Sequence, residues 1–253
     1  MSIEKLKIID AGDNELSLPR GFNIKAEPVG RRTSVLEVAY SHGGRDLSDG
    51  CFTPRRVEIA GKLWAHSDDD FNEKWDSLAF ILVQENIRIK YRGRLIHAVR
   101  AEDISLVYPS QVGFHFGEVV VSYLCVDPFW YALQTKTVDV STGGTSPYNI
   151  NLTPLGNIEV FPEIKITSYD DNASFSLRNV TDGEREFTFE DAGVGDGSIV
   201  EINCKTGEVA LDGDSAIASF SGMFLRLLPG RENTLRYTGA EAKIEIFYRE
   251  AWL

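Results

Sequence analysis

Short segments that alternate apolar and polar residues account for most of this 253-residue chain. Such alternation turns one set of side chains toward a core and the other toward water, which is typical of half-buried β-strands. In the first half, the pattern predicts strands at residues 35–40, 56–61, 87–91, 95–99 and 114–123. In the second half, it predicts strands at residues 158–160, 163–166, 175–177, 186–189, 199–202, 208–211, 223–227, 234–237 and 243–248. Their recurrence at roughly 8–12 residues is typical of a sandwich or barrel. We therefore expect a mainly β protein.

One segment instead has helical periodicity. Ser67 is the expected N-cap, and residues 68–70 are all Asp, which the helix dipole favours in a first turn. Apolar residues then recur at helical spacing from Phe71 to Leu82, and we expect Asn86 to end the helix. An acidic triplet also suggests a metal site, but no further ligand residue stands at helical spacing from it. The sequence therefore favours a solvated first turn.

The character of the chain changes near residue 135. The stretch between Ser141 and Pro154 is rich in Gly, Ser, Pro and Asn, which predicts a linker or long loop. Beyond it, Lys205-Thr206-Gly207 predicts a tight hairpin between two strands. We therefore expect an N-terminal domain with one helix at residues 1–135 and a C-terminal β-sandwich at residues 136–253.

The charge balance restricts the partners. The formal net charge is -12, from 38 acidic and 26 basic residues, so a dedicated grip on nucleic acid is not expected. The longest apolar run, residues 119–126, has the length of a strand and not of a membrane span. The N-terminus shows no secretory signal, so we expect a protein that folds in the cytoplasm without a membrane partner.

Residues that could carry chemistry are scattered. The three cysteines (Cys51, Cys125 and Cys204) are widely spaced, which predicts free thiols, buried or half-buried. The four histidines (His42, His66, His97 and His115) show no metal-binding spacing. Residues 193–197 resemble a phosphate-binding loop, but a strand and not a helix follows, so a turn is expected. Asp212-Gly213-Asp214 predicts a surface turn. We therefore expect no enzyme, and no catalytic, cofactor or metal site.

A proline followed by three aromatic residues marks the end of the N-terminal domain. Pro128 excludes helical geometry at Asp127 and ends the strand ladder. Phe129, Trp130 and Tyr131 then offer a large apolar surface where one domain leads into the next. The favoured interpretation is a core or interdomain cluster, and the alternative is a contact between subunits.

The predicted sandwich leaves a second functional class open. Exposed aromatic residues on a β-sandwich can bind sugars, and Phe161, Tyr169 or Tyr148 could serve. A carbohydrate-binding module that attaches to host cell-surface glycans is therefore the alternative function. A glycosidase ranks third, because nothing in the sequence singles out a pair of carboxylates.

Several motifs, in order along the chain, resemble the distal tail protein family of siphophages and related tailed phages. The clearest is DPFWY at residues 127–131. The others are PRRVEIAGKL at 54–63, the predicted helix, YRGR at 91–94, LGNIEVFPEI at 155–164, SGMFLRLLPG at 221–230, NTL at 233–235 and IFYREAWL at 246–253. The resemblance spans nearly the whole chain, and the order and spacing of the motifs carry more weight than any single one.

The resemblance implies a structural role in the virion. Six copies of the N-terminal hub domain would close a ring around the tail channel, and a galectin-like or carbohydrate-module-like sandwich would project outward. The ring would connect the tail tube protein to the tail-associated hub or tip protein, with receptor-binding proteins as further partners. DNA would pass through without sequence-specific recognition, and the net charge suggests an acidic lining that repels it. The protein would be made in the bacterial host cytoplasm.

Overall fold

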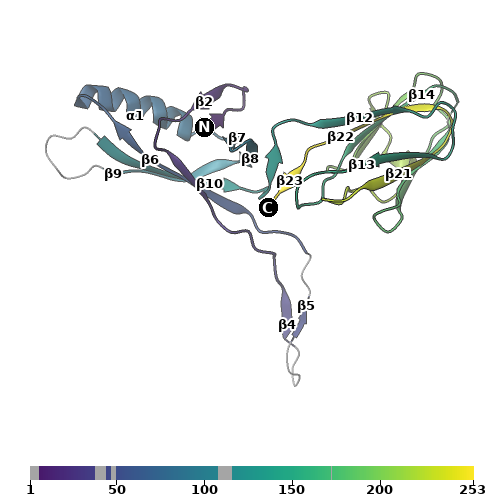
Figure 1. The fold of residues 1–253 in the computed structure, drawn as a ribbon, viewed down its shortest axis with the longest axis horizontal. Coiled ribbons are helices and arrows are strands. Elements are labelled where there is room, and N and C mark those ends of the chain that lie inside the picture. Colours follow the sequence, from purple (N-terminus) through teal and green to yellow (C-terminus); the bar gives the residue numbers. More distant parts are fainter. Residues whose placement is uncertain (1–5, 38–43, 47–49, 108–115, 172) are drawn as a thin grey trace. The chain divides into compact units, whose positions relative to one another are not determined.

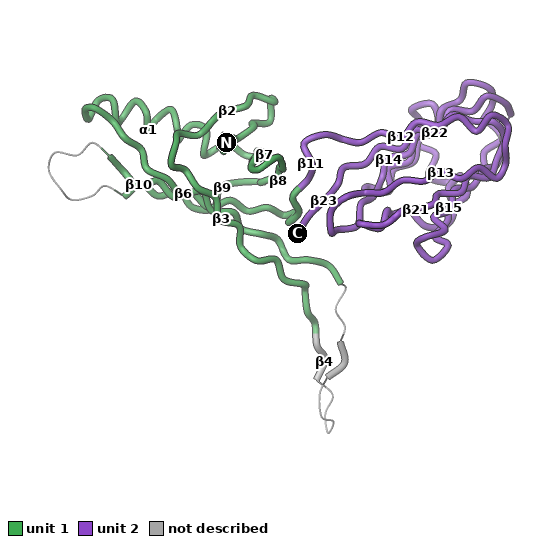
Figure 2. Tube along the Cα trace, viewed as in Figure 1, with its two compact units in different colours: residues 1–130, 253 green, residues 131–252 purple. Residues whose placement is uncertain are grey.

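The computed structural model describes residues 6–37, 44–46, 50–107, 116–171 and 173–253, with only the backbone at 35–37 and 44–46. In this part of the chain, antiparallel strands dominate and there is one α-helix, which confirms the mainly β class. The chain divides into two compact units (Figure 2): an N-terminal unit of residues 1–130 with Leu253, and a C-terminal unit of residues 131–252. Along the chain, the boundary between the two units lies after Trp130, a few residues before residue 135, where the sequence changes character.

The N-terminal unit contains two groups of paired strands (Figure 1). In the first group, the strands lie in the order β2 (Glu15–Ser17), β1 (Lys7–Ile9), β7 (Ile87–Tyr91) and β8 (Arg94–Ala98). The second group is a four-stranded sheet in the order β3 (Asn23–Ala26), β6 (Arg55–Trp64), β10 (Phe116–Cys125) and β9 (Arg100–Val107). A separate two-stranded ribbon pairs β4 (Val35–Glu37) with β5 (Gly44–Asp46).

Helix α1 (Asp68–Leu82) begins as predicted. The Ser67 hydroxyl accepts a hydrogen bond from the Asp70 N–H at 3.2 Å, and the Asp70 carboxylate accepts one from the His66 N–H at 2.8 Å. The first bond satisfies one of the N–H groups that a helix terminus leaves free, and the second fixes the residue before the cap. The predicted end at Asn86 is wrong, because the helix ends at Leu82 with Val83 as C-cap. Asn86 instead has a positive φ of 55° and donates its N–H to the Val99 carbonyl, which leads the chain into β7.

The helix packs on one face of the four-stranded sheet. Phe71 approaches this face so closely that a Cβ on Gly117 of β10 would lie 3.0 Å from its ring. At the other end of the helix, the Tyr123 hydroxyl donates a hydrogen bond to the Leu82 carbonyl at 2.9 Å. The core of the unit forms around these contacts from apolar residues of both strand groups and the helix, among them Ile8, Val57, Ile59, Leu82, Ile89, Val119 and Val121.

The C-terminal unit is a β-sandwich, which confirms the predicted layer architecture. One sheet has the order β12 (Lys136–Ser141), β22 (Ala242–Tyr248), β14 (Glu163–Ser168), β17 (Ile199–Asn203), β18 (Glu208–Leu211) and β19 (Asp214–Ser215). The other has the order β13 (Tyr148–Leu152), β21 (Asn233–Thr238), β15 (Ser174–Asn179), β16 (Arg185–Glu190) and β20 (Phe220–Gly222). A short 3-10 helix, η1 (Ile217–Ser219), precedes β20, and the short strands β11 (Trp130–Ala132) and β23 (Ala251–Trp252) flank the sandwich in sequence.

Alternation along these strands builds the sandwich core. Isoleucines and valines of the first sheet, such as Ile166 and Ile244, face aromatic residues of the second, such as Phe175, Phe187 and Tyr237. The predicted hairpin is confirmed, because Lys205–Gly207 lies in the turn that joins β17 to β18.

Three predictions about the C-terminal half are wrong, and the first is the strand expected at residues 158–160, where the structure has only isolated bridges at Ile158 and Val160. Residues 141–154, expected to be a linker, contain β13, whose Ile150 and Leu152 are buried in the sandwich. The turn residues around it hid this five-residue alternation. Residues 223–227, expected to be a strand, are irregular apart from one bridge between Leu227 and Val160, although Leu225 and Leu227 are fully buried. The apolar residues that alternate in this segment are buried in the core, but the backbone does not pair with a neighbouring strand to form a ladder.

Candidate assembly surfaces

The Pro128–Tyr131 segment divides its side chains between the two units. Pro128 is buried, and the Phe129 ring packs edge-on against Phe52, with ring centroids 5.3 Å apart. Trp130 packs half-buried against the core of the N-terminal unit. Tyr131 belongs to the C-terminal unit, where the Lys205 ammonium lies 5.2 Å from the centroid of its ring. Each unit thus anchors part of the segment, and the role of these residues as a subunit contact stays a prediction.

The face of the four-stranded sheet opposite α1 is named here the open sheet face. Its side chains come from alternate residues of β6 and β10: Arg56, Glu58, Ala60, Lys62, Trp64, Phe116, Glu118, Val120, Ser122 and Leu124. They are exposed or half-buried. Trp64 is 58% exposed and stacks on Phe116 at a centroid distance of 4.7 Å. An exposed stacked aromatic pair of this kind is common at protein interfaces.

Charges near the open sheet face compensate one another. Arg56 pairs with Glu102 of β9 at 2.6 Å, and Lys62 pairs with Glu118 at 3.3 Å. Hydrogen bonding by Glu102 also raises the pKa of Arg56. β6 and β10 place two basic residues (Arg56 and Lys62) and two acidic residues (Glu58 and Glu118) on this face, so these two strands give it no acidic excess.

The two outer strands of the same sheet, β3 and β9, provide different edges. In the described chain, each pairs on one side only, with β6 and β10 respectively. An unpaired edge presents N–H and C=O groups that can pair with another strand. Because the two edges differ in sequence and lie on opposite sides of one sheet, they could support a head-to-tail contact between copies.

The residues that the sequence suggested for catalysis or metal binding lie in loops and turns or on the surface. Residues 193–197 lie in the loop between β16 and β17, and Val194 in that loop is buried. Asp212 accepts a hydrogen bond from the Ile199 N–H at 2.7 Å in the turn before β19. His66 and His97 are exposed, whereas His42 and His115 lie outside the described residues. In the described ranges, no three His, Cys, Asp or Glu side chains are grouped so as to hold a metal ion.

The cysteines are free thiols in two different environments. Cys125 and Cys204 are buried, and desolvation raises the pKa of each thiol to about 12, which keeps both protonated and unreactive. Cys51 is exposed, so the prediction that all three are buried or half-buried is wrong for this residue. It follows Gly50, which has a positive φ of 73°.

The three aromatic residues considered for sugar binding do not gather on one surface. Phe161 is 39% exposed and precedes β14, whereas Tyr169 is 45% exposed and follows the same strand. They therefore lie at opposite ends of β14. Tyr148 begins β13 in the other sheet and is half-buried.

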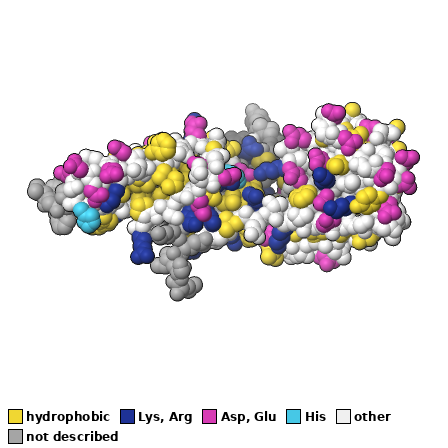
Figure 3. All heavy atoms as spheres, turned by 90° about the horizontal axis from the view of Figure 1, so that it is seen from above, with side chains coloured by type: hydrophobic (Ala, Val, Ile, Leu, Met, Phe, Trp, Pro, Cys, Tyr) yellow, Lys and Arg dark blue, Asp and Glu magenta, His cyan; other side chains and the backbone are white. Residues whose placement is uncertain are grey.

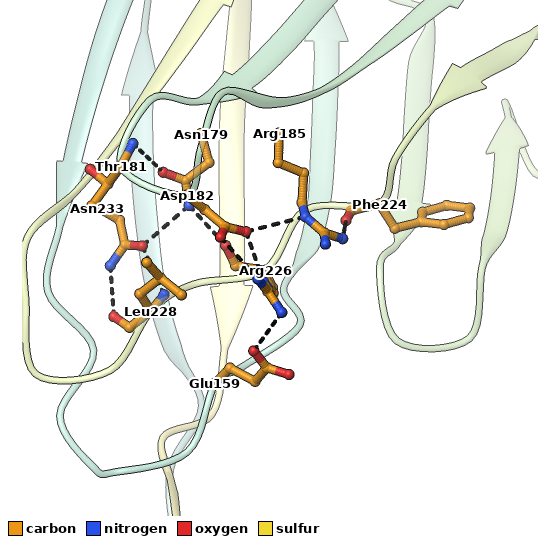
Figure 4. A network of polar contacts seen from close by, with 9 residues as sticks. All are labelled: Glu159, Asn179, Thr181, Asp182, Arg185, Phe224, Arg226, Leu228 and Asn233. Carbon is orange, nitrogen blue, oxygen red and sulfur yellow. Dashed lines mark hydrogen bonds and ion pairs between the residues drawn. The ribbon is translucent and has the colours of Figure 1, made fainter. Parts of the chain in front are cut away.

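A polar network, named here the Asn–Arg clasp, fixes the irregular segment 223–232 to the sandwich (Figure 4). Asn233 is fully buried, accepts a hydrogen bond from the Leu228 N–H at 2.8 Å and donates to the carbonyls of Leu228 and Arg231. Asn179, also fully buried, donates to the Arg226 carbonyl at 2.8 Å. The guanidinium of Arg226 forms two hydrogen bonds with Asp182, at 2.8 and 3.1 Å.

The clasp explains two motifs of the sequence. Hydrogen bonding by Asp182 and the nearby charge of Glu159 raise the pKa of Arg226, so the network retains its charge. Arg185 also pairs with Asp182 at 3.1 Å and donates to the Phe224 carbonyl. The motifs at 221–230 and 233–235 are therefore held by mostly part-buried hydrogen bonds, which fits a role in stabilising the fold. Sequence reasoning missed this network, because its partners are up to 67 positions apart.

The sequence and the fold were compared with those of known proteins. Residues 155–252 match the model of the family described as siphovirus-type tail component, C-terminal domain. The fold is similar to the crystal structure of the SPP1 Dit (gp 19.1) protein, described as a paradigm of the hub adsorption apparatus in phages that infect Gram-positive bacteria. The TM-score is 0.73 at 15% identity, over 99% of this chain and 100% of that chain. The C-terminal sandwich thus matches the siphovirus-type tail component model, the fold of the chain is like that of the SPP1 Dit protein, and the resemblance to the distal tail protein family is confirmed.

Two further solved structures give lower scores. A chain of the phage p2 baseplate in its activated conformation with Sr gives a TM-score of 0.44 at 11% identity, over 96% of this chain and 97% of that chain. The same baseplate with Ca gives 0.42 at 11% identity, with the same coverage. No curated protein sequence matches the chain. In the part of the chain that the structure describes, no helix has the length and apolar character needed to cross a membrane.

Proposed function

We propose that this chain is a structural protein of a phage tail that forms a closed ring of six copies at the distal end of the tail. The observation that carries the proposal is the fold likeness to the SPP1 hub protein along the whole chain, joined to the family match in the sandwich. The likeness of fold supports a role as a tail hub protein. The number of six copies is proposed in addition to it.

In this proposal, the N-terminal unit forms the ring. The edge of β9 in one copy faces the edge of β3 in the next, and the open sheet face with Trp64 contributes apolar surface. Head-to-tail contacts of this kind close into a ring when the rotation between copies allows it. The Pro128–Trp130 segment supports the same unit from its C-terminal end.

The ring would connect the tail tube protein to the tip proteins and the host-adsorption apparatus, with the virion as its location. The sandwich would contact tip or receptor-binding proteins. A structural and not a catalytic role is supported by the family match and by the structural positions of the residues considered for chemistry.

Negative-stain imaging of the purified full-length chain tests the proposal. We expect closed particles with a central channel and sixfold averages. Compact particles without a channel at every concentration tried would contradict the ring.

A carbohydrate-binding role for the sandwich is the alternative. The separation of Phe161 from Tyr169 along β14 offers no shared platform for a sugar ring, so the geometry favours this role less. Glycan-array binding by the full chain that is lost in a Tyr169→Ala or Phe161→Ala variant would support the alternative.

A further inference from the structure

Arg55, the first residue of β6, is a charged side chain with only 5% of its surface exposed. Its Nε atom is fully buried without a hydrogen-bond partner, and no other side-chain nitrogen or oxygen in the described ranges is in that state. Within the same ranges, no carboxylate forms an ion pair with Arg55. By contrast, Arg226 binds Asp182 and Arg56 binds Glu102. Among the residues that the structure describes, Arg55 is therefore a buried guanidinium without a counter-charge.

The charge of Arg55 cannot be removed by a neighbour. Desolvation lowers its pKa from the ordinary value, and the thiol of Cys125 is the one titratable group that opposes this shift. Because burial also raises the pKa of that thiol to about 12, the thiol stays neutral near pH 7. An arginine remains protonated in proteins, so Arg55 carries a positive charge in a desolvated environment. This charge destabilises the monomer unless an anion pairs with it.

The surroundings of Arg55 suit a carboxylate. Arg55 lies opposite Cys125 in the β6–β10 ladder, and the same two chain segments bring the Phe52 and Phe129 rings together a few residues further on. The guanidinium of Arg31 lies 5.3 Å from the centroid of the Phe52 ring. Nε is the one nitrogen of Arg55 that is fully buried without a hydrogen-bond partner, so the two terminal nitrogens are where an incoming oxygen would bind. A guanidinium fork matches a carboxylate with two parallel hydrogen bonds.

We propose that Arg55 receives a carboxylate from a second copy of this chain when copies assemble, an inference that rests on the ring proposed above. Each copy carries 38 acidic and 26 basic residues, so its carboxylates outnumber its basic side chains. The excess lies mainly in residues 131–253, which hold 19 acidic and 10 basic residues. On that part of the chain, Figure 3 shows many acidic and few basic side chains. In a head-to-tail ring, each copy both supplies the carboxylate and receives one.

An Arg55→Met variant tests the inference, because methionine keeps much of the side-chain length without the charge. As a dilute monomer, the variant should melt a few degrees higher than the original chain, since an uncompensated buried charge is gone. Its association into rings should weaken by about 30-fold or more, the usual effect of removing one partner of a buried charge pair. Differential scanning calorimetry and sedimentation velocity measure the two effects.

Two further variants make the test specific. Arg92→Met removes an exposed arginine at the β7–β8 turn, and should change neither melting nor association. Arg55→Lys keeps the charge and should melt like the original chain, yet associate more weakly because an ammonium cannot form the fork contact. This second variant also serves if Arg55→Met does not fold.

The outcomes separate this inference from the ring itself. Rings that form equally well from the Arg55 variants would overturn the inference and leave the ring standing. A chain that forms no rings would overturn both. If acetate or phosphate raises the melting temperature of the original monomer but not that of Arg55→Met, while both associate equally, the site takes a free anion and the second copy is excluded as its source.

Discussion

Trp130 is the residue at which the two interpretations of the Pro128–Tyr131 segment can be separated. It is half-buried against the core of the N-terminal unit. We expect Trp130→Ala to lower the free energy of unfolding by about 1–3 kcal/mol, less than for a fully buried tryptophan. Urea unfolding measures the loss, and sedimentation measures the ring. A destabilised chain that still forms rings supports the core interpretation, whereas lost rings with unchanged stability would show a subunit contact.

Asn233 is the residue on which the Asn–Arg clasp depends most. Replacing it with alanine leaves the partly buried N–H of Leu228 without its acceptor, as well as two carbonyls without their donor. We expect Asn233→Ala to cost about 2–3 kcal/mol in urea unfolding. The control is Asn149→Ala, which removes an exposed hydrogen bond to Arg236 and should stay within about 0.5 kcal/mol. Equal effects of the two variants would contradict a stabilising role for the clasp.

Among the elements, helix α1 is expected to contribute stability that depends on pH. The hydrogen bond from Lys74 and that from the His66 N–H hold the pKa of Asp70 below its ordinary value. A carboxyl group whose pKa is lowered by folding contributes stability above its unfolded pKa and loses it as pH falls through the folded one. We therefore expect the original chain to melt higher than Asp70→Asn at neutral pH. The difference should shrink as pH falls below about 4, and a pH-independent difference in calorimetry would contradict this.

Elements with strong local signals were predictable from the sequence. The strand at 87–91 has the predicted bounds, and the helix begins at the predicted cap, because alternation and capping act over a few residues. Strands β1, β2, β3 and β13 were missed, and each is three to five residues long and depends on pairing with distant strands. Length is not the whole reason, because β9 and β12 were also missed and have eight and six residues. The segment 223–227 shows the opposite error, because buried leucines do not by themselves specify a ladder.

For the candidate surfaces, the sequence supplied the Pro128–Tyr131 segment and the family resemblance. It could not supply the unpaired state of Arg55, because PRRVEIAGKL contains two adjacent arginines that look alike. In the structure, alternation turns Arg56 to the open sheet face, where Glu102 pairs with it, and turns Arg55 to the buried face. Such a difference depends on the register with β10 and on where distant acidic residues fall.

At the scale of the whole molecule, the net charge is unevenly divided. Residues 1–130 contain 16 basic and 19 acidic residues, whereas residues 131–253 contain 10 basic and 19 acidic residues. The hypothesis of an acidic lining assigned the net charge to the channel. The compensated open sheet face and the nearly balanced N-terminal unit give that hypothesis less support than the total of -12 suggested.

The mass of the assembled chain in solution tests the central claim most directly. Sedimentation equilibrium of the purified full-length protein should give a closed species of six times the 28.2 kDa chain, with no larger species as concentration rises. A series of masses that keeps growing with concentration, or a monomer throughout, would contradict a closed ring of six copies.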